Sequence, residues 1–533
     1  MIIKQLSRNV HIMLVVALVA TATLLFSGCR GAGPAGKKAF EIGEYDRAIS
    51  KLSKAYAKPG LPRDVKGEYA FYLGECYRLR GQFKKASGYY KTAVRYKYSD
   101  DIALLYLGEC QRATGDFEGA RESFDTYLAR HKNDPRARNG LQSIKMTEAQ
   151  WDAITSFNPS AVPDSGYIVN LAKEFNSKYS DYSPAFVGDG YDVVYITSMR
   201  VAKRRRKMNR ITGQGNSGIY MTKIDGQGKW TDPEHLEEPF ANNIDDGTPS
   251  ITSDGKTMYF TRCPYSETEP NTPQCFETTR SGGRWGEPVR VIPGGDSTMM
   301  VAHPAISPDG TTLYFVSDCD YPGAMGGKDI YRTRKTPSGD WSRAENLGAL
   351  VNTRGDEMFP YIRSNGDLYF SSNGQPGFGG LDIYLAHLDE RGIYRVSNMG
   401  LPINSSADDF GIIFKDNKEE GYLSSSRAGS KGIDNIYSFV LPPMILSMSG
   451  TVATADGTPP QKAFVRLIGS DGTNQKLTPD ENGQFALVVD KDVDYIVLCG
   501  AEGCKNQKLK FSTQNKTKSE TILLNVKLEK LEY

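Results

Sequence analysis

The chain has 533 residues, which is too many for a single hydrophobic core and predicts about three domains. Its 65 basic and 63 acidic residues give a formal charge of +2, so the composition excludes a general electrostatic attraction to nucleic acid. The 30 Tyr, 22 Phe and 54 Gly residues favour strands joined by tight turns over an all-helical protein.

Residues 1–28 are predicted to be a signal peptide, because Lys4 and Arg8 precede the apolar run IMLVVALVATATLLF. This run of about 15 residues is too short to span a bilayer comfortably. It ends in LFSGC, which resembles a bacterial lipobox with Phe26 where Leu is usual. The resemblance implies that Cys29 is lipidated, and more than one acyl chain holds a protein stably on a membrane. The alternative is an ordinary cleaved signal with an incidental Cys.

The residues that follow Cys29 read RGAGPAG. Surface-exported lipoproteins of Bacteroidetes usually carry an acidic stretch at this place. RGAGPAG contains no acidic residue. By this comparison, we expect an outer-membrane lipoprotein that faces the periplasm.

Two cysteine pairs are placed to form disulfides in an oxidising compartment. Cys263 and Cys275 flank the loop of a predicted hairpin, and Cys499 and Cys504 flank a short turn. Cys319 has no evident partner. The sequence leaves open which of these bridges form.

Residues 29–155 are predicted to form tetratricopeptide-like helical repeats. Residues 70–101 and 104–135 match at a spacing of 34, which is the tetratricopeptide period. The matched positions are Leu73/Leu107, Gly74/Gly108, Gly81/Gly115, Phe83/Phe117, Ala86/Ala120 and Tyr90/Phe124. A looser copy covers 35–56, and residues 136–155 are expected to add a capping helix.

Three repeats are about the minimum for a stable solenoid. Cys76 and Cys110 occupy equivalent positions in two of them and are expected to be small buried residues. Such an array has a concave face and no catalytic groups, so its predicted role is protein–protein binding. The alternative is a structural spacer.

Residues 166–441 are predicted to form a five-bladed β-propeller. An anchor residue recurs at steps of 65, 55, 56 and 51, as Pro184, Pro249, Pro304, Pro360 and Gly411. Strands of alternating aromatic and β-branched residues follow each anchor, bounded by SDG, SPDG and SNGD turns. About 50 residues for each four-stranded unit is typical of a propeller blade. The alternative of six blades would need another anchor.

The stretch NLAKEFN at 170–176 resembles NLGALVN at 346–352, yet only the second follows an earlier blade. In the second copy this stretch supplies the outer strand that precedes the next anchor. We therefore expect residues 168–176 to complete the last blade, so that the two ends of the ring pair and no sheet edge stays exposed.

The stretches SDGKTMYF, SPDGTTLYF, GGKDIY and GGLDIY resemble the TolB-like and WD40-like propeller repeats of bacterial envelope proteins. They also resemble sialidase Asp-boxes faintly, but the Asp-to-Gly spacing differs. We expect Asp309 and Asp329 to hold backbone N–H groups at a turn and at a strand start, rather than to bind ligands or catalyse.

Residues 444–533 resemble the carboxypeptidase regulatory-like domain, a transthyretin-like β-sandwich. An opening SGTV strand is followed by AFVRL and by a TPDENGQF turn. Short alternating strands with turns every 8–12 residues support a sandwich independently. Modules of this kind are accessory: they bind other molecules or act as spacers between domains.

The sequence predicts no catalytic residue, metal or cofactor. Its five His residues have no metal-ligand spacing, and no nucleophile-elbow, Walker or dinucleotide motif stands in a suitable context. The basic run AKRRRKMNR at 202–210 lies in an insertion between the second and third strands of the first blade. It is placed to bind lipopolysaccharide phosphate, peptidoglycan acids or an acidic partner; the alternative is a solvated loop.

The order of these parts is similar to that in a family of Bacteroidetes envelope lipoproteins, which includes the Por-type periplasmic component of the type IX secretion and gliding apparatus. The resemblance implies a non-enzymatic scaffold anchored by Cys29. Its helical concave face and its propeller face would bind envelope proteins. The family's OmpA-like domain, which holds peptidoglycan, is not found in these 533 residues, so a peptidoglycan link stays open.

Two other functions remain as alternatives. One is a glycan-binding lipoprotein of polysaccharide uptake. The other is a carbohydrate-active enzyme that uses carboxylates on the propeller face, such as Asp318, Asp320 or Asp356.

Overall fold

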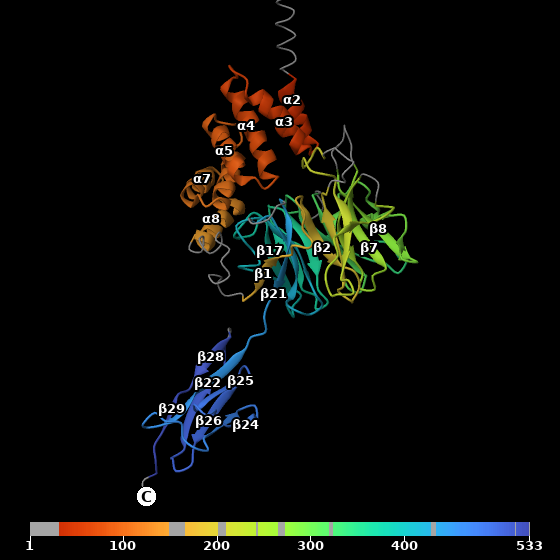
Figure 1. Ribbon diagram of the computed structural model, residues 1–533. Helices are drawn as coiled ribbons and strands as arrows, with labels where there is room; N and C mark the ends of the chain where they lie inside the picture. Colours follow the sequence, from red (N-terminus) through yellow and green to blue (C-terminus); the bar gives the residue numbers. More distant parts are fainter. Residues whose placement is uncertain are drawn as a thin grey trace, which may run out of the picture. The chain divides into compact units, whose positions relative to one another are not determined.

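The computed structural model describes residues 31–148, 166–200, 209–240, 244–264, 272–318, 323–427, 433–516 and 519–531 (Figure 1). Two compact units divide the chain, the first ending at Val440 and the second beginning at Leu441. The first unit contains both the helices and the first five sheets, and each unit is described by itself below.

The helical region consists of seven described helices. They are α2 (Ala32–Glu41), α3 (Tyr45–Tyr56), α4 (Arg63–Arg78), α5 (Phe83–Arg95), α6 (Ile102–Ala113), α7 (Phe117–Arg130) and α8 (Pro135–Thr147). The first six form three pairs, and α8 packs on the last pair. Helix α8 stands where the capping helix is expected, and the end of that predicted range lies outside the described residues.

The repeated small and aromatic positions bring the helices of each pair together. A Cβ atom on Gly74 would lie 2.8 Å from the ring of Tyr90, and one on Gly108 would lie 2.6 Å from the ring of Phe124. Both rings are fully buried, as are Cys76 and Cys110, whose burial confirms the prediction. The 34-residue period therefore reflects a packing requirement that recurs once in each pair.

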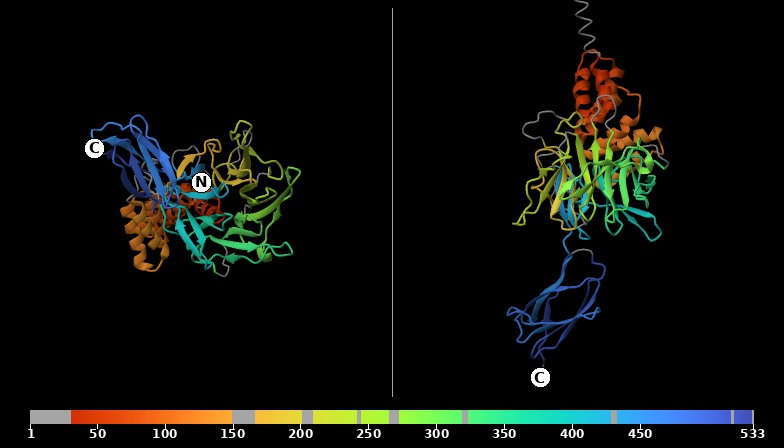
Figure 2. Two further views of the ribbon diagram at one scale, coloured as in Figure 1. Left: turned by 90° about the horizontal axis from the view of Figure 1, so that it is seen from below. Right: turned by 90° about the vertical axis from the view of Figure 1, so that its right-hand side faces the viewer.

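Residues 166–440 fold into five antiparallel sheets (Figure 2). The first comprises β2 (Asp181–Phe186), β3 (Val193–Ser198), β4 (Gly218–Lys223) and β5 (Glu234–His235). The second comprises β6 (Asp245–Ile251), β7 (Thr257–Cys263), β8 (Gln274–Ser281), β9 (Arg284–Trp285) and β10 (Val289–Arg290), and the third β11 (Ala302–Ile306), β12 (Thr312–Ser317), β13 (Asp329–Arg334) and β14 (Glu345–Asn346). The fourth comprises β15 (Glu357–Ile362), β16 (Leu368–Ser372), β17 (Asp382–Leu388) and β18 (Tyr394–Asn398). The fifth comprises β19 (Asp409–Phe414), β20 (Glu420–Ser425), β21 (Asn435–Val440) and β1 (Ile168–Leu171).

The five sheets form a closed ring. Their first strands, β2, β6, β11, β15 and β19, contact one another in turn, and β19 returns to β2. Strand β1 pairs with β21, with Ile168 opposite Val440 and Leu171 opposite Tyr437. The predicted closure by residues from both ends of the ring is therefore confirmed.

The asparagine that ends both NLAKEFN and NLGALVN has the same structural role in each stretch. The side-chain amide of Asn352 accepts a hydrogen bond from Ile330 N at 2.8 Å and donates one to Ile330 O at 2.9 Å. Asn176 binds Ile436 in the same way at 2.8 Å for both bonds. Each side-chain amide thus bonds both the N–H and the C=O group of one residue in a third strand.

Each first strand contains a bulge with one residue of positive φ. These residues are Ser183 (46°), Thr248 (48°), His303 (46°), Phe359 (52°) and Gly411 (58°). In three of them the N–H donates to a hydroxyl of the adjacent sheet, from Ser183 to Ser424, Thr248 to Thr197 and His303 to Thr261.

One predicted anchor was wrong by one residue. The bulges align Gly411 with Ser183, so Ile412 takes the place of the anchor prolines in the fifth sheet. The left-handed backbone favours glycine at this position, and the anchor place that follows requires no proline.

Asp309 and Asp329 have the predicted structural roles. Asp309 accepts a hydrogen bond from Thr311 N at 3.1 Å within a turn. Asp329 begins β13 and accepts one from Met325 N at 2.7 Å. Both carboxylates hold backbone N–H groups, as expected.

The second unit consists of two four-stranded sheets. One contains β22 (Leu446–Thr454), β25 (Gln484–Val489), β28 (Glu520–Leu523) and β29 (Val526–Leu528), and the other β23 (Phe464–Gly469), β24 (Asn474–Leu477), β26 (Asp494–Gly500) and β27 (Gln507–Ser512). Residues of both sheets, such as Met448 and Val497, share one buried core.

Neither candidate disulfide is formed. Cys275 is a buried free thiol that pairs across the sheet with Thr261 instead of Cys263. Cys499 and Cys504 are also free thiols, and burial raises the pKa of Cys499 to about 11. The positions of Cys29 and Cys319 lie outside the described residues.

Candidate functional site

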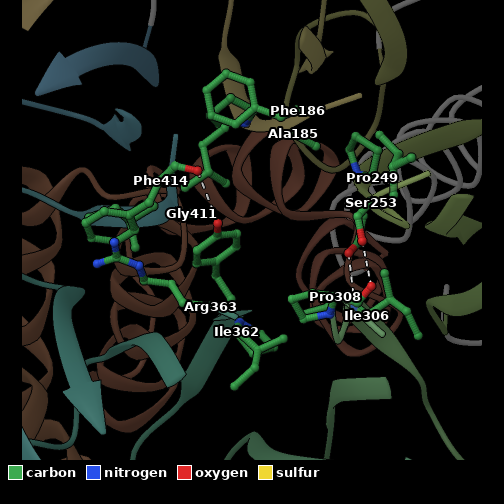
Figure 3. A pocket seen from close by; sticks show the side chains of 18 of the residues that line it. Ala185, Phe186, Pro249, Ser253, Ile306, Pro308, Ile362, Arg363, Gly411 and Phe414 are labelled. Carbon is green, nitrogen blue, oxygen red and sulfur yellow. Dashed lines mark hydrogen bonds between the residues drawn. The ribbon is translucent and has the colours of Figure 1, made fainter. Parts of the chain in front are cut away.

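The first strands of the five sheets enclose a cavity of about 500 Å³ (Figure 3). The anchors Pro184, Pro249, Pro304 and Pro360 line it, together with the apolar residues that follow them. Its two carboxylates are Asp189 and Asp416, and Arg363 supplies its guanidinium group.

The polar side chains of this cavity are only partly paired within the protein. Among the described residues, Ser183 Oγ, His303 Nδ1 and Arg363 Nε are buried without a hydrogen-bond partner. Arg363 pairs with Glu419 at 2.7 Å and lies over the ring of Phe414 at 4.3 Å. The hydroxyl of Tyr361 donates to Phe414 O at 3.3 Å. The cavity wall is therefore of mixed polarity, and its guanidinium group is paired with a carboxylate.

His303 is a cavity residue that the sequence did not single out. Its ring stacks on Phe359 with 4.0 Å between the ring centres, and Phe359 lies 4.6 Å from Phe410. Burial lowers the pKa of His303 to about 3, so the imidazole is neutral at ordinary pH. It is suited to aromatic packing and not to proton transfer near neutrality.

Of the carboxylates considered for sugar chemistry, Asp318 and Asp356 do not line this cavity. Asp318 is exposed just after β12. Asp356 accepts a hydrogen bond from Lys328 N at 3.1 Å and pairs with the ammonium group of Lys328 at 3.4 Å. Asp320 lies outside the described residues. Within the described ranges, no group of three or more His, Cys, Asp or Glu residues is placed to hold a metal ion.

A second site lies on the helices. Equivalent positions on α4, α6 and α8 are separated by 34 residues. One set consists of Glu75, Glu109 and Ser143, and a second set consists of Arg78, Arg112 and Met146. We call the surface made by these six residues and Asn139 the inner groove. Residues at equivalent repeat positions share one face of a helical solenoid, so the groove runs across successive helices.

The inner groove holds the loop between β16 and β17, the Gly374–Gly379 segment. Asn139 Nδ2 donates to Gly374 O at 2.6 Å, and Gly377 N donates to Ser143 Oγ at 2.9 Å. The guanidinium group of Arg112 donates to Gly377 O at 3.3 Å and also to Gly379 O. These partners are more than 230 positions apart in the sequence, so no local sequence pattern predicts the contact.

Phe378 adds an apolar contact to this site. Its side chain is 6% exposed and packs with Leu401 of the ring and Met146 of α8. The inner groove therefore contacts both the backbone and one side chain of the segment.

The helices contact the ring at a second place, near the basic run. As expected, that run lies between β3 and β4, although residues 202–208 of its range lie outside the described residues. Asp46 N donates to Arg210 O at 3.1 Å, and Arg80 donates to Thr212 O at 2.8 Å. Arg210 also pairs with Glu44 at 3.3 Å. The end of the run thus binds the turn between α2 and α3.

The inner groove carries a compact set of charges. Arg78 pairs with Glu75 at 3.0 Å and lies 4.0 Å from the ring centre of Tyr106. Burial raises the pKa of Glu109, and the guanidinium groups of Arg78 and Arg112 act against that shift. The repeat of Arg78 as Arg112 is a signal by which sequence analysis could have found this groove.

Buried carboxyls collect where the ring meets the helices. Burial raises the pKa of Glu357 and of Asp382 to about 7, and that of Asp408 to about 6. Each accepts a backbone hydrogen bond, from Thr353 N to Glu357, from Phe378 N to Asp382 and from Leu381 N to Asp408.

These carboxyls make the first unit more stable at mildly acidic pH. In the unfolded chain they ionise near pH 4–4.5, whereas in the folded state they keep their protons to higher pH. Their contribution is therefore present at low pH and is lost as the pH rises through 6 to 7. His303 acts in the opposite direction below about pH 6.5, but one imidazole is outweighed by three carboxyls.

We expect the free energy of unfolding of this unit to increase by about 2–4 kcal/mol between pH 8 and pH 5.5. Urea unfolding at a series of pH values would measure it. The Glu357→Gln variant should show a distinctly smaller increase, while Glu390→Gln, at an exposed position, should match the unmodified chain. An increase of the same size in Glu357→Gln would contradict the assignment.

A family model described as a tetratricopeptide repeat matches residues 80–135. The first such domain of Spaghetti (RPAP3), solved with an HSP90 peptide, is 24% identical, with 23% of this chain and 93% of that chain covered and a TM-score of 0.20. The Sgt2 domain from Aspergillus fumigatus is 20% identical, with 26% and 89% covered and a TM-score of 0.20. The GH43 endo-arabinanase from Bacillus licheniformis is 13% identical, with 49% and 93% covered and a TM-score of 0.32. No curated protein matched the chain.

The family match covers α5, α6 and α7, so the chain contains a tetratricopeptide repeat region, followed by a strand-rich region. In the part of the chain that the structure describes, no helix is both long and apolar enough to cross a membrane.

Proposed function

We propose that this protein is a non-enzymatic scaffold that binds other proteins of the bacterial envelope. The observation that carries this proposal is the inner groove of the tetratricopeptide region, which binds the Gly374–Gly379 loop through three hydrogen-bond donors and one acceptor. A groove of that kind is a protein-binding surface and not a catalytic one.

In this proposal the five sheets are the blades of a propeller, and the second unit is a carboxypeptidase regulatory-like sandwich. Five sheets, each with a path of four neighbouring strands, and the ring of contacts between their first strands support five blades over six. Two sheets around one core support the sandwich. Both modules then extend the surface available to partners.

Cys29 is proposed as the lipidated residue that holds the protein on the outer membrane, facing the periplasm. The lipobox-like sequence LFSGC supports this placement. The similarity in order of parts to the Por-type lipoproteins supports a link to type IX secretion or gliding. Peptidoglycan binding is not included.

Affinity purification from solubilised membranes tests this proposal. A tagged full-length copy should co-purify with defined envelope proteins, and the Cys29→Ser variant should lose its membrane attachment. Secretion or gliding components among the partners would support the proposed process, and proteins of polysaccharide uptake would favour the glycan-binding alternative. A protein that purifies alone after cross-linking in cells would overturn the scaffold proposal.

A further inference from the structure

We infer that the outer face of one sheet in the second unit binds a membrane surface through the phosphate groups of anionic phospholipids. The sheet is the one formed by β23, β24, β26 and β27. This inference goes beyond the proposed function, because it does not depend on partner proteins or on a lipid at Cys29.

The strand register brings four cationic side chains onto this outer face. Arg466 of β23 lies opposite Lys476 of β24 and Leu498 of β26, and Leu498 lies opposite Lys508 of β27. Lys510 comes two residues after Lys508, so it points to the same side of the sheet. All four cations are exposed, whereas the residues that alternate with them in β23 are buried in the core of the unit. We call this surface the cationic face.

The cations of this face lack counter-charges. Among the described residues, none of the four forms an ion pair; Arg466 Nε donates instead to Asn474 Oδ1 at 2.9 Å, and the ammonium group of Lys476 lies 5.2 Å from the ring centre of Phe464. Other lysines of the same unit do pair with carboxylates, at 2.6 to 3.8 Å, and these are Lys462, Lys491, Lys505, Lys516 and Lys530. Like charges on directly opposite strand residues, such as Arg466 and Lys476, are unfavourable unless a ligand supplies the opposite charge.

This concentration of cations does not follow from the composition of the unit. Residues 441–533 contain 11 basic and 11 acidic residues, so the unit has no net charge. In the four strands of the cationic face the one acidic residue is Asp494, at the start of β26. On the other sheet the corresponding outer positions are uncharged: Ser447, Ser449, Thr451, Gln484, Ala486, Val488, Thr521 and Leu523.

Apolar side chains lie between the cations. On β26, Leu498 and Ile496 are half-buried and lie opposite Lys508 and Lys510 of β27, and Ile468 of β23 lies opposite Ile496. Lysine side chains extend past apolar neighbours to reach charged groups, and surfaces that lie on membranes combine apolar contact with cations near the headgroups. A soluble acidic polymer would pair with the cations but leave the apolar side chains in water. A phospholipid surface complements both, so it is the ligand that this face fits best.

Binding of this kind should depend steeply on charge and salt. Each Lys or Arg close to an anionic membrane adds to the attraction, and the attraction decays within a Debye length. Removing all four cations should therefore have a large effect, and added salt should weaken binding by the unmodified face.

The test uses residues 30–533, which lack Cys29 and the predicted signal peptide, in sedimentation with lipid vesicles. Vesicles of phosphatidylcholine and phosphatidylglycerol should bind the chain, and vesicles of phosphatidylcholine alone should bind it at least tenfold more weakly. The fourfold variant Arg466→Gln, Lys476→Gln, Lys508→Gln and Lys510→Gln should bind the anionic vesicles at least tenfold more weakly than the unmodified chain.

A matched variant removes the same number of charges from the same unit. In it, Lys462, Lys491, Lys505 and Lys516, which are paired with carboxylates, are each replaced by Gln, and binding should stay within about twofold of the unmodified chain. Both fourfold variants retain the basic run at 202–210, so a difference between them cannot come from that run.

Two smaller changes complete the test. Leu498→Gln keeps every charge and should weaken binding at least threefold, because the apolar contact is lost. If the fourfold variant of the cationic face does not fold, the double variant Lys508→Gln with Lys510→Gln, on the edge strand β27, should still show a reduction.

Equal binding by the two fourfold variants would overturn the inference, since the loss would then reflect total charge or a different site. Binding that Leu498→Gln does not weaken would overturn it as well. A chain that binds the acidic polysaccharide alginate but not anionic vesicles would show that the face recognises a soluble acidic polymer instead. The proposed function would be unaffected by these results, because co-purification of partner proteins tests it separately.

Discussion

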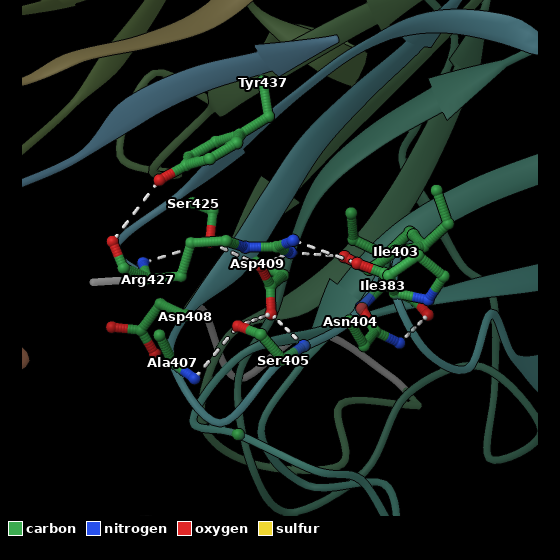
Figure 4. A network of polar contacts seen from close by, with 12 residues as sticks. Ile383, Ile403, Asn404, Ser405, Ala407, Asp408, Asp409, Ser425, Arg427 and Tyr437 are labelled. Carbon is green, nitrogen blue, oxygen red and sulfur yellow. Dashed lines mark hydrogen bonds and ion pairs between the residues drawn. The ribbon is translucent and has the colours of Figure 1, made fainter. Parts of the chain in front are cut away.

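The Arg427→Ala variant is expected to lose about 3–5 kcal/mol of the free energy of unfolding of the first unit. Arg427 is 4% exposed and forms an ion pair with Asp409, which is fully buried (Figure 4). Its guanidinium group also donates to Pro402 O at 2.9 Å and to Ile403 O at 2.6 Å. Removing it would leave a buried carboxylate without its charge partner and two carbonyl groups without a donor.

Urea unfolding of the variant and of two comparison proteins measures this loss. Arg395 pairs with Asp389 at the surface, with 73% of the arginine side chain exposed, so Arg395→Ala should change stability by less than about 1 kcal/mol. The double variant Arg427→Met with Asp409→Asn should regain part of the loss, because no unpaired charge remains. Equal effects of Arg427→Ala and Arg395→Ala would argue against a stabilising role for the buried pair.

The second large effect is expected at the closure of the ring. Phe175 is fully buried in the segment that follows β1, where it packs against Val194 and Ile436 of the first and fifth sheets. Its ring centre lies 5.1 Å from that of Trp230 and 4.9 Å from that of Tyr422. Phe175→Ala should therefore destabilise the first unit by about 3–5 kcal/mol.

Hydrogen exchange would show whether this loss concerns closure. In Phe175→Ala, the amides of β1, β21 and β3 should exchange faster together, because the first and fifth sheets separate at this seam. Phe511→Ala, in the second unit, should leave the exchange of these three strands unchanged. Fast exchange confined to β1, with β21 protected as before, would be inconsistent with a seam held by Phe175.

Much of the fold could be predicted because its signals are local and repeated. The glycine and aromatic positions of the helices recur because each helix pair repeats one packing contact, such as Gly74 against Tyr90. Ring closure could be predicted because NLAKEFN has no earlier blade to complete, and β1 does pair with β21.

Other features left no local signal. The anchor of the fifth sheet was misplaced because Gly411 resembles neither Ser183 nor the anchor prolines, although its backbone conformation matches that of Ser183. Cys263 and Cys275 flank a hairpin loop and suggested a disulfide, but the strand register places Cys275 opposite Thr261. Sequence spacing alone does not determine the register of a hairpin.

The groove and its occupant were missed for a related reason. A repeated arginine, Arg78 and Arg112, was visible in the sequence, and so was the glycine-rich loop at 373–380. Their contact joins residues 265 and 267 positions apart and depends on how the helices dock on the ring. No periodic pattern encodes docking between two repeat architectures.

Site-specific photo-cross-linking in living cells tests the central claim most directly. A photoreactive amino acid in place of Asn139 would report whatever occupies the inner groove. In the otherwise unmodified chain, we expect cross-links to the Gly374–Gly379 segment of the same molecule. At exposed positions of the same helices, we expect cross-links to a second envelope protein. If no second protein is captured at any of these positions, the helices do not bind partners, and the scaffold proposal is contradicted.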